Sequence, residues 1–374
     1  MKIAVNTRFL IKDKLEGIGV FTFETLKIIT EKYPEHKFYF LFDRKVDKEF
    51  IFSKNIEAII VHPQARHPFL WYLWFEWSLP KVLKKINADI FVSMDGYLPL
   101  RNKTKSLTVI HDLAFEHYPK DIPFLVKKYY KYYFPKFAQK ADRIATVSEF
   151  SKNDLIQKYG IEPNKIDVVY NGASDIFKAL SEKEKADVKK ELTASKDYFV
   201  YVGALHQRKN IPNLLKAYEK FRDNSQKEIK LVIVGRKAWG TKEMEDVFDS
   251  MKYKNDIIFT GRVSNERLAK YIASAVAMTY VSYFEGFGIP LIEAFACNVP
   301  VITSNSSSLP EVVGDAGLIV NPFDVEEIAI AMQKIAEDDT LRKKLIEKLK
   351  VQKQKFSWDK TAELLSKSMG ITEG

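Results

Sequence analysis

The sequence predicts an α/β protein built from two domains, each with a parallel sheet. Short apolar stretches alternate with helical stretches along the chain, and this alternation is typical of parallel sheets. The length of 374 residues exceeds what a single hydrophobic core usually serves. The turn signal Asn171-Gly172 follows an apolar stretch and precedes a run rich in lysine and glutamate. We therefore expect a first domain at 1–172 and a second at 173–354.

The expected strands lie in both halves of the chain, and most are separated by helical stretches. In the first half they are Lys2–Asn6, Phe38–Phe42, Ile59–His62, Ile90–Ser93, Leu107–His111, Ile144–Val147 and Ile166–Tyr170. In the second half they are Tyr198–Val202, Lys230–Val234, Ile257–Thr260, Ala277–Val281 and Val299–Ile302. Phe356-Ser357-Trp358-Asp359 opens a last amphipathic helix. That helix could cross back to the first domain, to which we assign residues 355–374.

Composition and charge narrow the class of protein. The net charge is +10, of which residues 1–170 carry most, so the first half could face anions such as lipid head groups, a phosphorylated substrate or nucleic acid. A lysine-rich background that keeps the protein soluble is the alternative. No nucleic-acid-binding motif is recognisable, and we expect no nucleic acid partner. The single cysteine, Cys297, and the lack of a secretory signal favour the cytoplasm.

Two segments of the first half mix aromatic and basic residues. The first runs from Pro68 to Trp77 and is followed by Lys81, Lys84 and Lys85; the second is Lys127–Lys136, rich in tyrosine and lysine. Such segments suit an anionic membrane surface, where rings lie at head-group depth. They suit equally well helices packed on a sheet with their lysines turned outward, and the sequence leaves both readings open.

The first half offers two candidate site features at strand ends. Gly17-Ile18-Gly19 precedes a helical stretch at Val20–Lys32, but it lacks the third glycine of a dinucleotide fingerprint and could be a tight turn. His111 closes a strand, where a side chain of an open α/β sheet faces the ligand crevice. A buried histidine bonded to a carbonyl oxygen is the alternative.

In the second half, glycines follow three strands, at Gly203, Gly235 and Gly261. Arg208 and Lys209 come shortly after Gly203 and just before a helical stretch at Pro212–Phe221. A planar guanidinium and an ammonium beside a helix start form a good phosphate site. Solvated surface cations are the alternative.

The richest stretch is Ser282–Val301, where a glycine-rich turn breaks into a helix led by Pro290. Glu285 should lie on the loop and Glu293 about one turn inside the helix, so that both can face one crevice. The alternative is an ordinary loop without a binding role, followed by a helix with a surface glutamate. The expected strands on either side argue against it, because ligands gather at the carboxyl ends of such strands.

Taken together, these motifs resemble the family-4 class of retaining glycosyltransferases. The stretch from Glu285 to Glu293, E-G-F-G-I-P-L-I-E, is similar to the E-x7-E motif of that class. Further similarity lies in Gly17-Ile18-Gly19, His111-Asp112, residues 146–151, Asn171-Gly172, Gly203 with residues 208–210, and residues 308–311. The resemblance covers nearly the whole chain. It implies the GT-B fold, in which two Rossmann-like domains face each other across a deep cleft and a C-terminal helix crosses back to the first domain.

The resemblance also implies roles for residues. The second domain would bind a nucleotide sugar and the first the acceptor. Glu293 would hold the ribose, and Glu285 with the N–H groups of Phe287 and Gly288 would contact the transferred sugar. Arg208 and Lys209 would neutralise the departing diphosphate without a metal ion. The expected catalytic residues are His111, Glu285, Arg208 and Lys209; the expected donor-binding residues are Gly17, Gly19, Gly203, Arg208, Lys209, Gly235, Val263, Glu285, Gly286, Phe287, Gly288, Ile289 and Glu293.

One position departs from the family pattern. Many relatives carry arginine directly after the glycine equated with Gly203, whereas this chain has Ala204. The phosphate charge would then rest more heavily on Arg208 and Lys209.

The resemblance leads us to expect a retaining, metal-independent hexosyltransferase without a cofactor, whose nucleotide sugar is a co-substrate. GDP-mannose is the favoured donor, and the expected acceptor is a lipid-linked saccharide or polysaccharide. A nucleotide-sugar epimerase, a phosphorylase or a non-catalytic sugar-nucleotide-binding subunit are the alternatives. No lysine site for the pyridoxal phosphate of a phosphorylase is recognisable. Peripheral attachment to the inner face of the cell membrane stays open. Base and sugar selection are expected to depend on loops such as Gly235–Gly240 and Gly261–Ser264.

Overall fold

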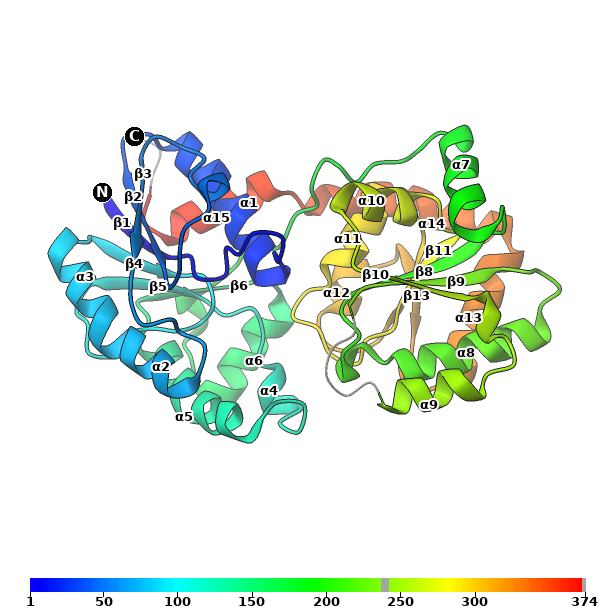
Figure 1. Ribbon diagram of the computed structural model, residues 1–374, viewed down its shortest axis with the longest axis horizontal. Helices are drawn as coiled ribbons and strands as arrows, with labels where there is room; N and C mark the ends of the chain where they lie inside the picture. The colour runs from blue at the N-terminus through cyan, green and yellow to red at the C-terminus, as the bar shows by residue number, and fades with distance from the viewer. Residues whose placement is uncertain (237–241, 372–374) are drawn as a thin grey trace. The chain divides into compact units, whose positions relative to one another are not determined.

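A computed structural model describes residues 1–236 and 242–371 of the chain. Residues 237–241, of which 237–240 belong to the loop expected to select base and sugar, and residues 372–374 lie outside the described residues. The chain divides into two compact units (Figure 1). Unit 1 comprises Met1–Asn171 and Ser357–Gly374, and unit 2 comprises Gly172–Phe356.

Unit 1 contains a seven-stranded sheet in the order β3-β2-β1-β4-β5-β6-β7, and all its paired strands are parallel. The strands are β1 (Lys2–Asn6), β2 (Lys37–Phe42), β3 (Ile56–Ile60), β4 (Ile90–Ser93), β5 (Lys105–Val109), β6 (Arg143–Thr146) and β7 (Ile166–Val168). The helices are α1 (Gly17–Lys32), α2 (Pro68–Leu73), α3 (Leu79–Ile86), α4 (Ala114–His117), α5 (Phe124–Lys140), α6 (Glu149–Tyr159) and α15 (Trp358–Ser368), with a π-helix at Trp74–Ser78.

Unit 2 contains a six-stranded parallel sheet in the order β10-β9-β8-β11-β12-β13. The strands are β8 (Tyr198–Val202), β9 (Lys230–Val234), β10 (Ile257–Gly261), β11 (Ala277–Tyr280), β12 (Val301–Ser304) and β13 (Gly317–Val320). The helices are α7 (Glu182–Thr193), α8 (Ile211–Asn224), α9 (Lys242–Ser250), α10 (Asn265–Ala273), α11 (Ile289–Ala296), α12 (Leu309–Val313), α13 (Val325–Glu337) and α14 (Asp339–Gln352). Two Rossmann-like units, each with a parallel sheet, confirm the expected fold class.

Several strand predictions need correction. The strand expected at Leu107–His111 is β5, Lys105–Val109, and the strand expected at Ile166–Tyr170 is β7, which ends at Val168. The strand expected at Ile59–His62 is β3, which runs from Ile56 to Ile60. It is the edge strand of its sheet, and it stops before Pro63, whose nitrogen has no hydrogen to donate. The strand expected at Val299–Ile302 is β12, Val301–Ser304, because Pro300 likewise cannot join the ladder as a donor. The edge strand β13 was missed altogether, because its sequence Gly-Leu-Ile-Val is short and begins with glycine.

The C-terminal helix α15 packs in unit 1, as the sequence predicts. It contacts α1 and β6, and in Figure 1 it is the red helix beside the blue α1. The rings of Phe21 and Trp358 meet edge to face with centroids 6.2 Å apart. The Thr361 hydroxyl donates a hydrogen bond to the carbonyl of Tyr170.

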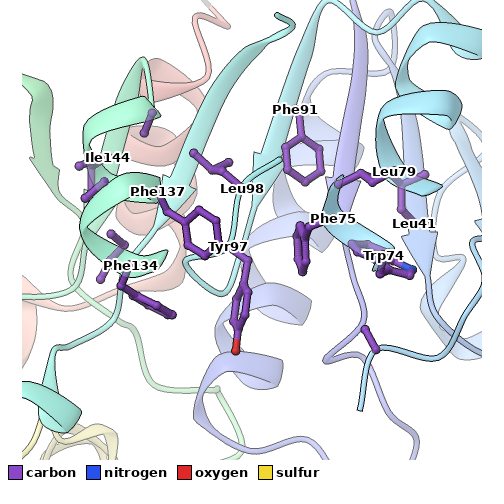
Figure 2. Packing of buried hydrophobic residues seen from close by; sticks show 14 of the residues in the cluster. Leu41, Trp74, Phe75, Leu79, Phe91, Tyr97, Leu98, Phe134, Phe137 and Ile144 are labelled. Carbon is purple, nitrogen blue, oxygen red and sulfur yellow. The ribbon is translucent and has the colours of Figure 1, made fainter. Parts of the chain in front are cut away.

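The two aromatic segments contribute mainly to the core of unit 1. Trp74 and Phe75 are fully buried, and Tyr129 and Phe134 are nearly so. Figure 2 shows Phe75, Tyr97, Phe134 and Phe137 within one cluster beside the sheet. For these residues the core reading is confirmed. Several apolar side chains nevertheless remain exposed along the same helices: Phe69, Trp77, Phe124, Leu125 and Tyr132.

Among residues 1–236 and 242–371, no helix combines the length and apolar character needed to cross a bilayer.

Candidate functional site

The central residue of the site in unit 2 is Glu285, on the loop between β11 and α11. The loop ends at Gly288, whose φ of 101° lies in the region that side chains disfavour. A Cβ at Gly288 would also lie 2.8 Å from Cδ2 of Leu309. Glycine therefore allows the sharp turn that starts α11 with Pro290 in its first turn, and this turn sets Glu285 above the end of β11.

Glu285 binds both predicted cations. Its Oε2 lies 2.6 Å from Nη1 of Arg208, and its Oε1 accepts a hydrogen bond from Nζ of Lys209. Burial by itself would raise the pKa of the Glu285 carboxyl, but Arg208 and Lys209 outweigh it and lower that pKa to about 2. The carboxylate is thus ionised and the three charges form one cluster, in which Glu285 and Lys209 are buried and Arg208 is partly exposed.

Tyr280, the last residue of β11, completes this cluster. Its hydroxyl donates to Oε1 of Glu285 at 2.9 Å and accepts from Nζ of Lys209 at 2.6 Å. Its ring stacks on that of Tyr201 in the neighbouring strand β8. Sequence reasoning missed Tyr280, although its place at a strand end five residues before Glu285 was a usable signal.

Two serines fix the backbone of Glu285. The Ser307 hydroxyl accepts from the Glu285 N–H at 2.9 Å, and the Ser308 hydroxyl donates to the Glu285 carbonyl at 2.9 Å. Ser308 appeared only as part of a family-like motif, and no role was expected for Ser307. These two hydrogen bonds hold the backbone of Glu285 in place, and the ion pairs hold its carboxylate.

The loop that carries the cations is anchored independently. Arg208 and Lys209 belong to a short 3-10 turn, Gln207–Lys209, which follows β8. Asn210 then adopts φ 61°, and its amide donates to the carbonyls of Val281 at 3.1 Å and Pro322 at 2.6 Å. The bond to Val281 ties the loop after β8 to the loop after β11, and the bond to Pro322 ties it to the segment after β13. Strand order reverses between the neighbouring strands β8 and β11, which is where open α/β sheets bind ligands.

Gly203 and Gly235 bring two loops close together at the same edge of the sheet. A Cβ on Gly235 would lie 1.8 Å from the Gly203 carbonyl oxygen. The Gly235 N–H donates to the carbonyl of Gly261 at 3.0 Å, and the partly exposed Val263 follows in the loop before α10. The glycines therefore form a bare backbone surface beside the cation loop.

Glu293 stands one turn inside α11, as expected, and is partly exposed. Its carboxyl makes no hydrogen bond or ion pair with the residues that the structure describes. Burial raises the pKa of this carboxyl to about 8. Gly286, Phe287 and Ile289 lie between the two glutamates, and the Phe287 ring packs against Phe356.

His111 lies in unit 1, two residues after Val109, the last residue of β5. Its Nε2 lies 3.0 Å from the carbonyl oxygen of Met94, so Nε2 carries the hydrogen and donates it. Burial lowers the pKa of His111 below its ordinary value. The ring is therefore neutral near pH 7, and Nδ1 is left with a lone pair.

Gly17 and Gly19 also belong to unit 1, at the start of α1. A Cβ on Gly19 would lie 2.9 Å from the carbonyl oxygen of Phe9, whereas Gly17 has open space. The donor roles predicted for both glycines stay predictions.

This arrangement in unit 2 can hold a doubly charged anion. Arg208 and Lys209 supply two cations and α11 supplies N–H groups at its start, while Glu293 can accept hydrogen bonds from hydroxyl groups when ionised. Among the residues that the structure describes, no group of three or more His, Cys, Asp or Glu side chains is placed to hold a metal ion.

Two family profiles match most of the chain. The profile of glycosyl transferases group 1 matches residues 182–352, and that of glycosyltransferase family 4 matches residues 20–175. The chain is 32% identical over 283 residues to O-antigen chain mannosyltransferase B of Escherichia coli, covering 74% of this chain and 73% of that protein. It is 30% identical over 287 residues to O-antigen chain mannosyltransferase RfbU of Salmonella typhimurium, covering 76% and 75%.

Solved structures share the fold over the full length. Anabaena Alr3699/HepE, in complex with UDP and glucose, superposes with a TM-score of 0.79 at 16% identity and covers 100% of both chains. At this identity the likeness establishes the fold alone, which is the GT-B arrangement of two Rossmann-like units.

Proposed function

Since this chain belongs to the family-4 glycosyltransferases and is an enzyme of that class, we propose that it transfers mannose from GDP-mannose to a saccharide or lipid-linked acceptor. The observation that carries the donor site is the cluster of Arg208 and Lys209 with Glu285, at the point where strand order reverses in unit 2. The choice of mannose is supported by the names of the relatives, two of which are O-antigen mannosyltransferases.

In this proposal the leaving diphosphate is stabilised by side chains. Negative charge grows on the diphosphate as the bond to the sugar breaks, and cations that are already in place stabilise that charge without reorganisation. Arg208 and Lys209 keep their ion pairs with Glu285 and share their remaining N–H groups with the phosphates. Glu285 stays ionised beside them and is free to accept hydrogen bonds from sugar hydroxyls.

In the same proposal, the Glu293 carboxylate binds the ribose of the nucleotide sugar. An ionised carboxylate can accept bonds from both ribose hydroxyls, and on α11 it stands one turn from the N–H groups at the helix start. His111 of unit 1 is neutral, and its Nδ1 can accept a hydrogen bond from a sugar hydroxyl.

The transfer is proposed to retain the anomeric configuration of the donor. A donor phosphate oxygen accepts the proton of the acceptor hydroxyl on the face from which the diphosphate leaves, so neither glutamate becomes a nucleophile. Proton NMR of the product should show the donor's α configuration. A β-linked product would contradict this stereochemistry, and inhibition by EDTA would contradict metal independence.

The proposal is tested by incubating the protein and a membrane extract with a panel of nucleotide sugars. We expect release of a nucleoside diphosphate, fastest from GDP-mannose, together with transfer of the labelled sugar into the extract. Conversion of the donor to another nucleotide sugar without release would indicate an epimerase. Binding without turnover of any donor would indicate a non-catalytic subunit.

We further propose that unit 1 meets an anionic membrane surface through α2, α5 and the π-helix between α2 and α3. Five apolar side chains are exposed there: Phe69, Trp77, Phe124, Leu125 and Tyr132. The 17 residues of α5 include lysines but no acidic residue, and Nζ of Lys136 lies 3.3 Å from the centre of the Tyr132 ring. Exposed rings flanked by lysines suit an anionic bilayer.

Sedimentation with phosphatidylserine vesicles tests this surface. We expect binding at low salt that weakens at high salt and is reduced in a Phe124→Ala/Leu125→Ala double variant. The matched control is Phe259→Ala, which removes an exposed ring of unit 2. Equal binding to neutral vesicles, or none to anionic ones, would contradict the proposal.

A further inference from the structure

Strand order reverses in unit 1 as well, between the neighbouring strands β1 and β4. Asn6 ends β1 and pairs with Ser93, which ends β4. In open α/β sheets, ligands bind beyond the carboxyl ends of the strands at such a reversal. Arg8 follows β1 by two residues, and Asp95 follows β4 by two residues.

Arg8 and Asp95 form a buried ion pair at this point. Nε of Arg8 donates to Oδ2 of Asp95 at 2.5 Å. The other carboxylate oxygen accepts from the Asn6 amide at 2.9 Å and from the Ser93 hydroxyl at 3.0 Å. Both strands therefore hold Asp95, and Asp95 in turn fixes the plane of the Arg8 guanidinium.

Aromatic rings line the guanidinium. Its carbon lies 4.3 Å from the centre of the Tyr97 ring, 5.3 Å from Phe75 and 5.2 Å from Phe9. Tyr97 and Phe75 stack on each other with centroids 5.1 Å apart, and Figure 2 shows these two rings side by side. Phe75 and Tyr97 are buried, whereas the Phe9 ring is 38% exposed and can meet a ligand.

The Arg8 side chain has donors to spare although only 5% of the residue is exposed. Besides Asp95, one N–H reaches the carbonyl of Ala65 at a long 3.5 Å, and the Tyr97 hydroxyl interacts with the guanidinium as well. A guanidinium carries five N–H donors, so this buried group keeps N–H groups that can bind a further acceptor. His111 is close by, because its Nε2 bonds the carbonyl of Met94, the residue before Asp95.

We propose that Arg8, Asp95 and Phe9 form a binding site for the neutral terminal sugar of the acceptor. The Arg8–Asp95 pair carries no net charge, so the site favours hydroxyl groups over phosphate. Hydroxyl oxygens accept from the remaining Arg8 N–H groups, and the apolar face of the sugar packs on the Phe9 ring. This inference rests on the proposed function, because it takes the ligand to be the acceptor of the transfer reaction.

The site is tested by saturation-transfer NMR on the full chain with methyl α-mannoside, methyl α-glucoside and N-acetylglucosamine as probes. We expect at least one to bind, and Arg8→Lys to weaken it about tenfold or more, because an ammonium cannot reproduce the planar fork. Phe9→Ala should weaken it about threefold through loss of the ring face. Phe259→Ala is the matched control, since this ring of unit 2 is exposed to the same degree, 37%, and it should change nothing.

Donor binding is measured in parallel by the thermal shift that GDP-mannose produces. Wild type and all variants should show the same shift, and a missing shift in wild type would count against the proposed function rather than this site. If Arg8→Lys does not fold, Phe9→Ala decides the matter. The inference is overturned if no probe binds wild type, if both variants bind as wild type does, or if mannose 6-phosphate binds more tightly than the neutral sugars in an Arg8-dependent way.

Discussion

Lys209 is the residue that the donor site depends on most, because it is the buried cation that lies against both Glu285 and Tyr280. In the proposed donor site its charge stabilises the leaving diphosphate, and the residue that follows Gly203 is the uncharged Ala204. We predict that Lys209→Ala lowers kcat/KM by at least about tenfold, or roughly 1.4 kcal/mol of transition-state stabilisation. Steady-state kinetics with varied donor measure this, and unchanged kinetics would remove Lys209 from the phosphate site.

Tyr280 acts through Lys209, so it is a positioning residue. Tyr280→Phe removes one oxygen that accepts from Lys209 and donates to Glu285, while the ring and its packing on Tyr201 remain. We predict a loss in kcat/KM of about three- to tenfold, or roughly 0.7–1.4 kcal/mol, which is the size of one ordinary hydrogen bond and smaller than the loss in Lys209→Ala. Tyr218→Phe is the control, because this buried hydroxyl bonds the carbonyl of Ile229. Equal losses in the two phenylalanine variants would mean a general effect on packing.

Glu293 should make both stability and donor binding depend on pH. Its pKa in the folded protein is raised from 4.5 to about 8, so between these values the folded state holds a proton that the unfolded state releases. Stability therefore falls as pH rises through this window. We predict that Glu293→Gln raises Tm relative to wild type more at about pH 8 than at about pH 5.

Donor binding should respond in the opposite direction. Only the ionised Glu293 carboxylate accepts from both ribose hydroxyls, so GDP-mannose should bind wild type more tightly as pH rises toward the pKa of Glu293. The Glu293→Gln variant should lose this dependence. A wild-type affinity that is flat across the window would contradict the ribose assignment.

At the scale of elements, the loops after β8 and β9 need glycine where they meet. The Gly235 Cα faces the Gly203 carbonyl oxygen so closely that a Cβ would stand 1.8 Å from it, and the φ of Gly235 is 156°. We predict that Gly235→Ala costs about 1–3 kcal/mol or more of unfolding free energy. Gly17→Ala, which meets nothing within 4 Å, should change Tm little, and equal Tm values in both variants would show that the loops can move apart.

Sequence patterns predicted most central strands well and two of the four edge strands poorly. β1, β4, β8 and β9 were expected with the bounds they have, because strands buried on both faces read as continuous apolar runs. The edge strand β3 was expected three residues too late and the edge strand β13 was missed, whereas the edge strands β7 and β10 were expected to begin where they do, at Ile166 and Ile257. The sequences of β3 and β13 are polar or short, as edge strands can be because one side faces solvent, and so they lack that signal.

The candidate site was only partly readable for a similar reason. Arg208, Lys209 and Glu285 stood out through charge and neighbouring glycines. Tyr280 and Ser307 did not, because an aromatic residue at a strand end and a serine in a loop are common, and only the fold brings them to Glu285. The Arg8–Asp95 pair escaped notice because its partners are 87 residues apart.

At the scale of the whole molecule, both units have an ion pair at the point where strand order reverses. Each sheet reverses its strand order once, and at each reversal a buried ion pair joins the loops after the two central strands: Arg8 with Asp95 in unit 1, and Lys209 with Glu285 in unit 2. In unit 1 one cation balances one carboxylate. In unit 2, Arg208 adds a second cation, and this excess of positive charge supports the proposals that the phosphate-bearing donor binds unit 2 and the neutral acceptor sugar binds unit 1.

The central claim is that Arg208 and Lys209 bind the diphosphate of a nucleotide sugar. Its most direct test is the thermal shift of wild type and Lys209→Ala across a panel of nucleotide sugars and nucleoside diphosphates, because a ligand selective for the folded state raises Tm with concentration. We predict that GDP-mannose and GDP raise the Tm of wild type and that the shift is lost or much reduced in Lys209→Ala. A panel that leaves the Tm of wild type unchanged, or an equal shift in the variant, would contradict the claim.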